Sequence, residues 1–125
     1  MLGLSNGVSS DFRDLIAADE SGNEYAKDAL ETYAYRVAKY IGAYAVGMKG
    51  LDAVVFTAGV GENTIPIRKK ICEYLSIFDA KIDDEKNNIR GEEAIVSTDD
   101  SKVKIMIIPT NEELAIARET VALVK

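Results

Sequence analysis

The feature that most constrains the fold is an apolar run at residues 51–57 that stops at a pair of glycines and is followed by a helical pattern. The unbroken run LDAVVFT predicts a strand over residues 53–57, buried on both faces as strands of parallel sheets are. Gly59 and Gly61 then stand one residue apart, and apolar positions from residue 65 to about 78 predict a helix. A strand that passes directly to a helix in this way indicates an α/β fold.

A second strand and helix follow the same order further along the chain. Residues 102–108 are mostly apolar and predict a strand that Pro109 ends. The sequence TNEE then predicts a helix that opens with a capping box between Thr110 and Glu113, three residues apart. Between the two units, residues 79–101 are polar and rich in turn formers, and they predict only short strands near 81–82 and 94–97.

Two helices are expected before the first strand. Ser9, Ser10 and Asp11 predict the start of a short helix that ends near residue 18. Residues 23–48 predict a long helix, ended by glycines 47 and 50, whose apolar residues recur at steps of three or four. Its apolar stripe consists of Ala26, Leu30, Tyr33, Val37, Ile41, Ala45 and Met48. The whole order predicts two parallel strands joined by a right-handed crossover.

Composition excludes several classes of function. The 125 residues suffice for one domain, and 15 basic against 21 acidic residues give a net charge of −6 that would repel a nucleic acid backbone. Cys72 is the single cysteine and histidine is absent, so a disulfide framework, a thiolate metal cluster, a histidine triad and most zinc sites are excluded. No apolar run reaches ~18 residues and no signal peptide pattern is present, which favours the cytoplasm.

The glycine pair has a chemical interpretation and a structural one. Ligands of open α/β sheets bind beyond the carboxyl ends of the strands, where Gly59 and Gly61 are expected, and a helix start offers free N–H groups to a phosphate or a nucleotide base. A tight turn without any ligand explains the glycines equally well. The loop is not a P-loop, and Thr64 stands where a dinucleotide fingerprint needs a third glycine.

Two charged stretches also have two interpretations each. Glu112 and Glu113 are expected in the first turn of the last helix. In the first interpretation they stabilise the helix dipole and the cap, and in the second one of their carboxylates binds a magnesium ion, directly or through water. Asp11 and Arg13 form a surface ion pair in the first interpretation. Placed near a glycine loop and a metal carboxylate, however, Arg13 would complete a phosphate site.

Three stretches taken together resemble one family. GVSSDFRD (7–14), VVFTAGVGENTIPIR (54–68) and IIPTNEELAIARET (107–120) are similar, in this order and at these separations, to the C-terminal part of the acetokinase (acetate kinase) family of the sugar kinase/Hsp70/actin superfamily. YIGAY (40–44) adds to a resemblance that covers essentially the whole chain. It implies an α/β fold, namely a partial ribonuclease H-like (actin-like ATPase) C-terminal domain over residues 1–125, with parallel strands and packing helices.

The resemblance also implies an activity and a set of site residues. The family transfers a phosphoryl group between ATP and acetate with Mg²⁺, giving acetyl phosphate and ADP. On the matching motifs, Asp11 and Arg13 lie at the nucleotide, Arg13 is also the catalytic candidate at the transferring phosphate, and Glu112 serves the magnesium ion. The loop under the adenosine consists of Gly59, Val60, Gly61, Glu62 and Asn63. The family more often has glycine at position 58 and isoleucine at position 60.

Further parts of the family's site have no counterpart in this sequence. The second glycine loop, the acetate pocket and the catalytic aspartate belong to earlier parts of the family's chain, so this chain is expected to be a fragment that needs the missing N-terminal domain and is inactive alone. A propionate kinase fragment fits the same motifs. Two more classes stay open, namely a stand-alone nucleotide-binding or dimerisation module without catalysis and a purely structural domain. The tyrosines and small residues of the helix at 23–48 predict a homodimer.

Overall fold

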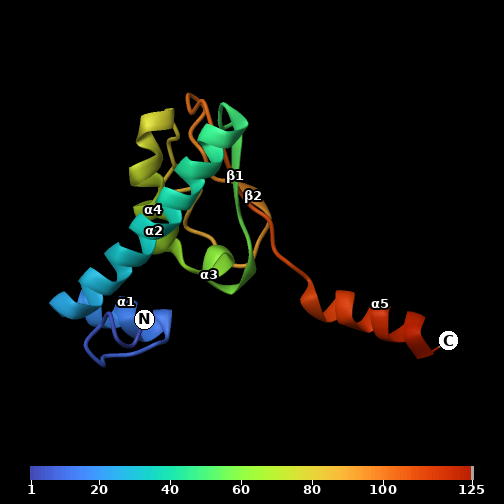
Figure 1. Cartoon of the computed structure of the whole chain (residues 1–125), viewed down its shortest axis with the longest axis horizontal. Coiled ribbons are helices and arrows are strands. Elements are labelled where there is room, and N and C mark those ends of the chain that lie inside the picture. Colours follow the sequence, from blue (N-terminus) through green and yellow to red (C-terminus); the bar gives the residue numbers. More distant parts are fainter. Residues whose placement is uncertain (125) are drawn as a thin grey trace.

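The computed structural model describes residues 1–124 of the chain (Figure 1). Helices and strands alternate as expected for an α/β fold. The elements in chain order are α1 (Phe12–Glu20), α2 (Glu24–Met48), β1 (Ala53–Phe56), α3 (Ala58–Asn63), α4 (Ile65–Tyr74), the 3-10 turn η1 (Leu75–Phe78), β2 (Ala94–Ile95), β3 (Lys104–Ile107) and α5 (Glu112–Val124). No helix within residues 1–124 is long and apolar enough to cross a membrane.

The strands form one small mixed sheet in the order β1-β3-β2. β1 and β3 pair in parallel, with Val54 opposite Ile105 and Phe56 opposite Ile107, which confirms the predicted pairing of the two apolar segments. β2 runs antiparallel to β3, and Ile82 forms a single antiparallel bridge with Ser97. The carboxyl ends of β1 and β3 therefore meet at one edge of the molecule, where α3 lies in Figure 1.

The core lies on one face of this sheet. Val54, Phe56, Ile105 and Ile107 are buried there with residues of α2 and α4, which lie together beside the sheet in Figure 1. The prediction that the first strand is buried on both faces is wrong for this chain, because its side chains alternate and Val55 is 45% exposed. The described helices cover only one face of the strands, so only alternate side chains are covered.

Alanines rather than large residues form the buried face of α2. Its buried residues are Ala26, Ala29, Leu30, Ala34, Ala38 and Ala45. Small side chains let the axis of α2 approach its neighbours closely, as the small residues of the sequence indicated. Phe12 of α1 packs edge-on against Tyr33, with ring centroids 4.8 Å apart, whereas Met48, predicted to lie on the apolar stripe, is exposed.

The helix boundaries follow local capping. The Asp11 side chain accepts from the Arg13 N–H at the start of α1, and the Asn23 side chain accepts from the Ala26 N–H at the start of α2. α2 ends with Lys49 in the left-handed conformation, so neither of the glycines predicted to end it takes that position. The Gly50 N–H closes the helix by donating to the Ala45 carbonyl at 3.0 Å.

The helix predicted over residues 65–78 is divided in the structure. α4 ends at Tyr74 and the chain continues as the 3-10 turn η1, after which Asp79 takes the left-handed conformation. Pro66 lies in the first turn of α4, where its missing N–H costs no hydrogen bond. Thr64 precedes that helix but makes no side-chain cap.

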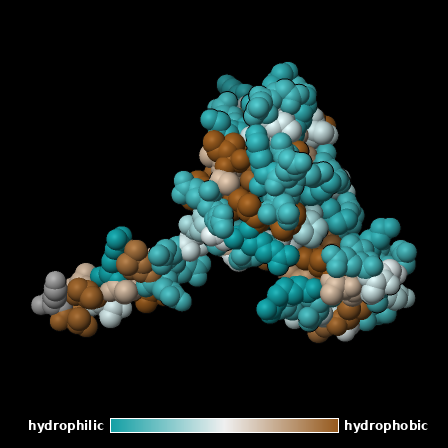
Figure 2. Space-filling view, turned by 180° about the vertical axis from the view of Figure 1, so that it is seen from behind, coloured by the Kyte–Doolittle hydropathy of each residue, from teal (hydrophilic) through white to brown (hydrophobic). Residues whose placement is uncertain are grey.

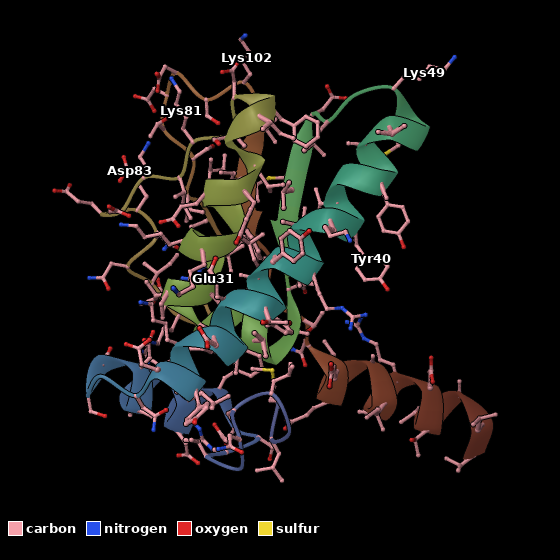
Figure 3. The ribbon with its side chains drawn as sticks, turned by 60° about the vertical axis from the view of Figure 1, so that its left-hand side comes forward. Glu31, Tyr40, Lys49, Lys81, Asp83 and Lys102 are labelled. Atoms are coloured by element: carbon pink, nitrogen blue, oxygen red, sulfur yellow. The ribbon has the colours of Figure 1, made fainter. Side chains whose placement is uncertain are left out.

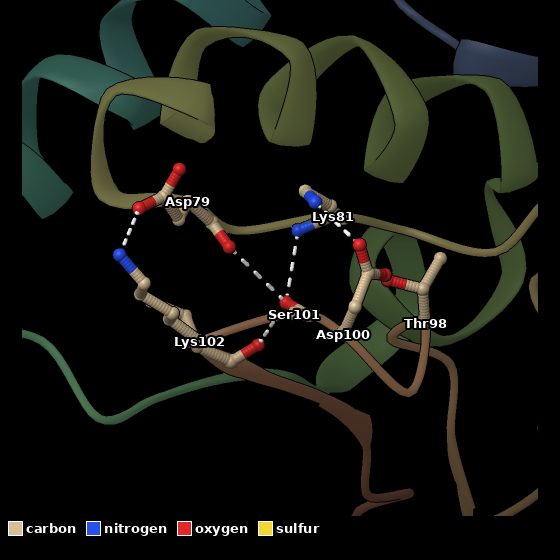
Figure 4. A network of polar contacts seen from close by, with 7 residues as sticks. Asp79, Lys81, Thr98, Asp100, Ser101 and Lys102 are labelled. Carbon is tan, nitrogen blue, oxygen red and sulfur yellow. Dashed lines mark hydrogen bonds and ion pairs between the residues drawn. The ribbon is translucent and has the colours of Figure 1, made fainter.

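A polar network closes the opposite end of the sheet, around the amino end of β3 (Figure 4). The Ser101 hydroxyl accepts from the Lys81 N–H at 2.9 Å and donates to the Val103 carbonyl at 2.6 Å. Thr98 donates to Asp100 at 2.7 Å, and Lys102 pairs with Asp79 at 2.6 Å. These contacts hold the chain between β2 and β3 far from the carboxyl ends of the strands.

α5 leaves the body of the molecule as an arm (Figures 1 and 2). None of its residues is buried, and its large apolar side chains, among them Leu114, Ile116 and Val121, are exposed. In Figure 2 brown side chains lie beside teal ones along the arm. These apolar side chains are therefore left uncovered by the other described residues, 1–111.

Candidate functional site

The candidate site lies where β1 and β3 end. β1 passes through Thr57 into α3, and β3 passes through Pro109 toward α5. The Ile108 N–H donates to the Phe56 carbonyl at 3.0 Å, which keeps the two exits adjacent. Because the strands are parallel, both exits point the same way, and ligands of α/β sheets bind at such ends.

The glycine loop is a short helix rather than an extended turn. Ala58 begins α3 with a φ of 58°, a left-handed conformation that glycine adopts with less strain than alanine. A Cβ added at Gly59 would meet nothing within 4 Å, whereas one at Gly61 would lie 3.3 Å from the carbonyl carbon of Phe56. Gly61 therefore allows α3 to pack on the end of β1, and Gly59 leaves open space in front of the loop.

A cavity of about 500 Å³ joins this loop to the start of α1. Its lining residues are Ser10, Asp11, Phe12, Arg13, Gly59, Val60, Asn63 and Thr64. Two motifs that are almost 50 residues apart in the sequence thus share one hollow. The loop is further braced by Asn63, whose side-chain N–H donates to the Gly59 carbonyl at 3.0 Å.

Asp11 and Arg13 form the ion pair that their spacing indicated. Nε and one terminal nitrogen of Arg13 donate to the two carboxylate oxygens of Asp11 at 3.1 and 2.8 Å. These bonds lower the pKa of the Asp11 carboxyl to about 2, and Asp11 raises the pKa of Arg13. The Arg13 side chain is nevertheless 89% exposed, so its guanidinium stays accessible to an anion in the cavity.

A second cavity, of about 380 Å³, is also lined by Gly59. Its lining residues are Gly59, Glu62, Thr110, Asn111, Glu112 and Glu113. Gly59 is common to both cavities, so the cavity that contains the Asp11–Arg13 pair adjoins the one that contains Glu62, Glu112 and Glu113. The three motifs of the sequence therefore converge on a single glycine.

The side chain of Glu62 turns toward the protein. Its Oε1 accepts from the backbone N–H of Thr110 at 2.7 Å and from the Thr110 hydroxyl at 3.0 Å. The Thr110 N–H is the main cause that lowers the pKa of Glu62, and the residue is only 9% exposed. Oε1 of Glu62 is therefore engaged with Thr110, and the Glu62 carbonyl accepts from Arg68 and from the Gly91 N–H.

This contact overturns the predicted capping box. In the predicted capping box the Glu113 side chain accepts a hydrogen bond from the Thr110 N–H, but in the structure this N–H donates to Glu62. The cap of α5 is Asn111, whose Oδ1 accepts from the Leu114 N–H at 3.0 Å. An asparagine one residue later caps the helix, and the threonine is recruited by a carboxylate 48 residues away.

Arg68 is a residue of this region that sequence reasoning missed. It is fully buried, and its guanidinium donates to Gly61 and Glu62 carbonyls on one side and to Asn87 and Ile89 on the other. An arginine next to Ile67, on the buried face of α4, was the available signal. The hydrogen bonds of Arg68 to Gly61 and Glu62 fix the end of α3.

The predicted residues are thus distributed over two adjoining cavities. Asp11, Arg13, Gly59, Val60 and Asn63 line one cavity, and Glu62 and Glu112 line the other with Gly59. Gly61 lies behind the loop against Phe56. Whether these residues contact a nucleotide or a metal stays a prediction.

The donor set of the second cavity suits magnesium. Within the described residues no cluster of three carboxylate, thiolate or imidazole groups could by itself hold a metal. Mg²⁺ commonly takes only one or two protein carboxylates and completes its octahedron with waters and phosphate oxygens. Glu112, beside the open face of Gly59, offers such a carboxylate next to the space that a phosphate would need.

Comparisons with known proteins agree with this geometry. A family model described as "Acetokinase family" matches residues 1–118. The acetate kinase of Carboxydothermus hydrogenoformans is 60% identical over 124 residues, and that of Lachnoclostridium phytofermentans is 61% identical over 124 residues. Both alignments cover 99% of this chain, which spans 31% of the length of each of these curated relatives.

Solved structures of the same group superpose well on the chain. The Porphyromonas gingivalis acetate kinase gives a TM-score of 0.85 at 44% identity over 99% of this chain and 31% of its own. A propionate kinase from Francisella tularensis gives 0.83 at 40% identity over 94% of this chain and 29% of its own. The fold and the order of the motifs are shared over nearly the whole sequence, and the chain belongs to the acetokinase family.

Proposed function

We propose that this chain is the nucleotide-binding C-terminal part of a Mg²⁺-dependent enzyme that transfers a phosphoryl group between ATP and acetate, giving acetyl phosphate and ADP. The observation that carries the proposal is the convergence of three motifs around Gly59. Family membership supports the reaction type, since the similar proteins are named acetate kinases. The activity belongs to the full-length protein, of which the relatives' length indicates this chain is a part.

In this proposal the adenosine lies against the loop of residues 59–63. The open space in front of Gly59 admits it, and the backbone of α3 forms the supporting surface. Asp11 and Arg13 face the same cavity from α1, where the accessible guanidinium neutralises phosphate charge. Stabilising the charge of the transferring phosphoryl group in this way is the main catalytic demand of the reaction.

Glu112 would hold the magnesium ion, directly or through a water molecule. When bound, the ion would supply positive charge that offsets the charge developing on the transferring phosphoryl group. The cavity with Glu112 and the cavity with Arg13 are both lined by Gly59, so a nucleotide placed across Gly59 would reach both. None of these residues selects the acyl group.

Propionate is therefore the alternative acceptor. The Francisella tularensis structure, described as a propionate kinase, resembles the chain in fold nearly as closely as the Porphyromonas gingivalis acetate kinase does, with TM-scores of 0.83 and 0.85. Full-length enzyme assayed with ATP and either acid, with acyl phosphate trapped as the hydroxamate, would decide between them. Turnover with neither acid would contradict the proposed function.

Nucleotide binding has its own test. Gly59→Val places a branched side chain in the open space before the loop, and we expect ADP affinity of the full-length enzyme to fall at least tenfold by calorimetry, as a loss of about 1.4 kcal/mol of contact would produce. Val60→Ile, the residue more common in the family, is the control and should bind ADP normally. If Gly59→Val binds ADP with unchanged affinity, the loop is only a structural turn and does not contact the nucleotide.

We further infer that the full-length enzyme forms a homodimer through α2. Tyr40, Tyr44, Val46 and Met48 are exposed near the end of this helix, and Tyr40 projects away from the body in Figure 3. Aromatic residues and methionine are enriched at interfaces. Light scattering should give twice the protomer mass, and a monomer at micromolar concentration would refute the assignment.

A cytoplasmic location fits the proposed reaction. ATP is a cytoplasmic substrate, and the single cysteine of the sequence is buried and unpaired in the structure. Reporter fusions of the full-length protein would test this location by fractionation.

A further inference from the structure

The contact between Glu62 and Thr110 joins the two halves of the candidate site. One carboxylate oxygen accepts two hydrogen bonds from a single residue, at 2.7 Å from its N–H and 3.0 Å from its hydroxyl. Hydrogen bonds to an ionised acceptor are shorter and stronger than neutral ones, and in this contact the Glu62 side is buried while Thr110 is exposed. The contact is therefore a firm link between the glycine loop and the residues that precede α5.

The loop side of this link is held independently. Arg68 donates from the same terminal nitrogen to the carbonyls of Gly61 and Glu62, at 3.0 and 2.9 Å. Gly61 also packs against the backbone of Phe56. Residue 62 is thus fixed to the core by contacts that do not involve Thr110.

The other side of the link has no such support. The ladder between β1 and β3 ends with the Ile108 N–H, and α5 buries none of its residues. Among residues 1–124, the two hydrogen bonds to Glu62 are the only ones that tie the segment from Pro109 onward to the rest of the molecule. Glu112 begins α5 two residues after Thr110.

We propose that Glu62 is a positioning residue, which holds Thr110 and thereby places the Glu112 carboxylate relative to the glycine loop. This inference rests on the proposed function, in which Glu112 serves magnesium and the loop serves the nucleotide. Because Arg68 fixes the loop without Thr110, loss of the link displaces the metal carboxylate more than the adenosine surface. The link should therefore affect magnesium use more than nucleotide affinity.

The competing interpretation is that the Glu62 carboxylate contacts the nucleotide itself. Its Oε1 already has two donors, and a carboxylate facing phosphates would repel them. The two interpretations predict different phenotypes. A ligand contact would alter affinity for nucleotide, whereas a positioning contact alters the magnesium requirement.

The experiment uses the full-length enzyme and four variants. Glu62→Ala removes the acceptor, Glu62→Gln keeps an uncharged acceptor, Thr110→Val removes only the hydroxyl, and Thr110→Ser retains both donors. Kinetics give the Mg²⁺ concentration for half-maximal rate and, separately, the KM for ATP at saturating Mg²⁺. Hydrogen exchange of the amides from 110 to 115 provides a readout that does not depend on activity.

We expect Glu62→Ala to raise the half-saturating Mg²⁺ concentration about tenfold, the scale for losing hydrogen bonds to a charged group, with the KM for ATP changed less than about threefold. Glu62→Gln and Thr110→Val should fall between it and the unmodified enzyme, and Thr110→Ser should restore normal behaviour. The amides of the segment should exchange faster in Glu62→Ala.

Two control variants separate these effects from general destabilisation. Thr98→Val removes another threonine hydroxyl that donates to a carboxylate, at the far end of the sheet (Figure 4). Glu73→Gln removes a negative charge from the exposed surface of α4. Both should leave the magnesium requirement and the exchange of residues 110–115 unchanged.

Three outcomes overturn the proposal: an unchanged magnesium requirement in Glu62→Ala, a loss of ATP affinity larger than the magnesium effect, or equal effects of Thr98→Val and Thr110→Val. If the unmodified enzyme shows no turnover with acetate or propionate and no Mg²⁺-dependent ADP binding, the proposed function fails instead. In that case amide exchange still decides the link, because unchanged exchange in Glu62→Ala would contradict it.

Discussion

Nε of Arg68 donates to Oδ1 of Asn87 at 2.7 Å, and both residues are almost completely buried. The other donors of Arg68 go to four backbone carbonyls, so every partner of this buried cation is neutral. Burial lowers the pKa of Arg68, but the carbonyl dipoles compensate the charge as a carboxylate would elsewhere. The arginine joins the end of α3 to the segment around residue 88.

We expect Arg68→Lys to destabilise the protein strongly. An ammonium has three donors and no planar fork, so it cannot reach carbonyls on both sides, and at least one buried carbonyl would lose its partner. The free energy of unfolding should fall by about 3 kcal/mol, the scale for leaving buried polar groups unsatisfied. Urea denaturation measures this change. Lys69→Arg, at an exposed ion pair with Asp84, should be neutral, and equal midpoints for both variants would refute the role of Arg68.

Glu112→Gln should weaken the use of magnesium without loss of fold. The substitution keeps the shape of the side chain and removes the charge that a hard cation prefers. We expect the Mg²⁺ concentration for half-maximal rate to rise about tenfold or more, as changes at metal sites do. Glu113→Gln makes the same charge change one residue later and should leave the magnesium requirement nearly normal. If Glu113→Gln raises the magnesium requirement more than Glu112→Gln does, Glu113 rather than Glu112 serves the magnesium ion.

The two glycines of the loop should respond differently to alanine. Gly61→Ala places a Cβ 3.3 Å from the Phe56 carbonyl carbon, so α3 must shift, and overpacking of this kind costs about 1–3 kcal/mol. Gly59→Ala points into open space and should cost little stability. Thermal melting of both variants compares them directly. Equal melting temperatures would show that α3 adjusts without strain.

Cys72 should be inert in the folded protein. The thiol is buried, and burial raises its pKa from 9.0 to about 12. Because the thiolate is the reactive species, a disulfide reagent at about pH 8 should label one thiol per chain only after denaturation. Because the pKa is higher in the folded protein, the contribution of the thiol to the free energy of unfolding is fully present below about pH 9 and is lost as pH rises toward 12. Rapid labelling of the native protein would contradict the burial.

Local patterns predicted the elements but not the long-range contacts that reassign particular residues. The two strands β1 and β3 and the long helix predicted over residues 23–48 follow from apolar runs and apolar period, which are local properties. The capping box failed because Thr110 donates to Glu62, a partner far away in the sequence. Arg68 was missed for the same reason, since its carbonyl partners belong to segments whose proximity only the fold creates.

Burial of β1 was overestimated for a different physical reason. A continuous apolar run is expected wherever both faces of a strand become covered. In the described chain α2 and α4 cover one face, and Val55 on the other is left open. Sequence reports what a strand can bury, whereas the packed neighbours decide what it does bury.

The exposed state of α5 has a consequence for how its shape is maintained. A helix of 13 residues is marginal in water without packing, and this one rests on no other element among residues 1–124. The helical content of α5 therefore depends on what packs against it, and the rate of proteolysis within α5 measures that packing. Trypsin should cleave after Arg118 rapidly while α5 is exposed. Cleavage should become slow once another surface packs against α5 and shields its backbone from the protease.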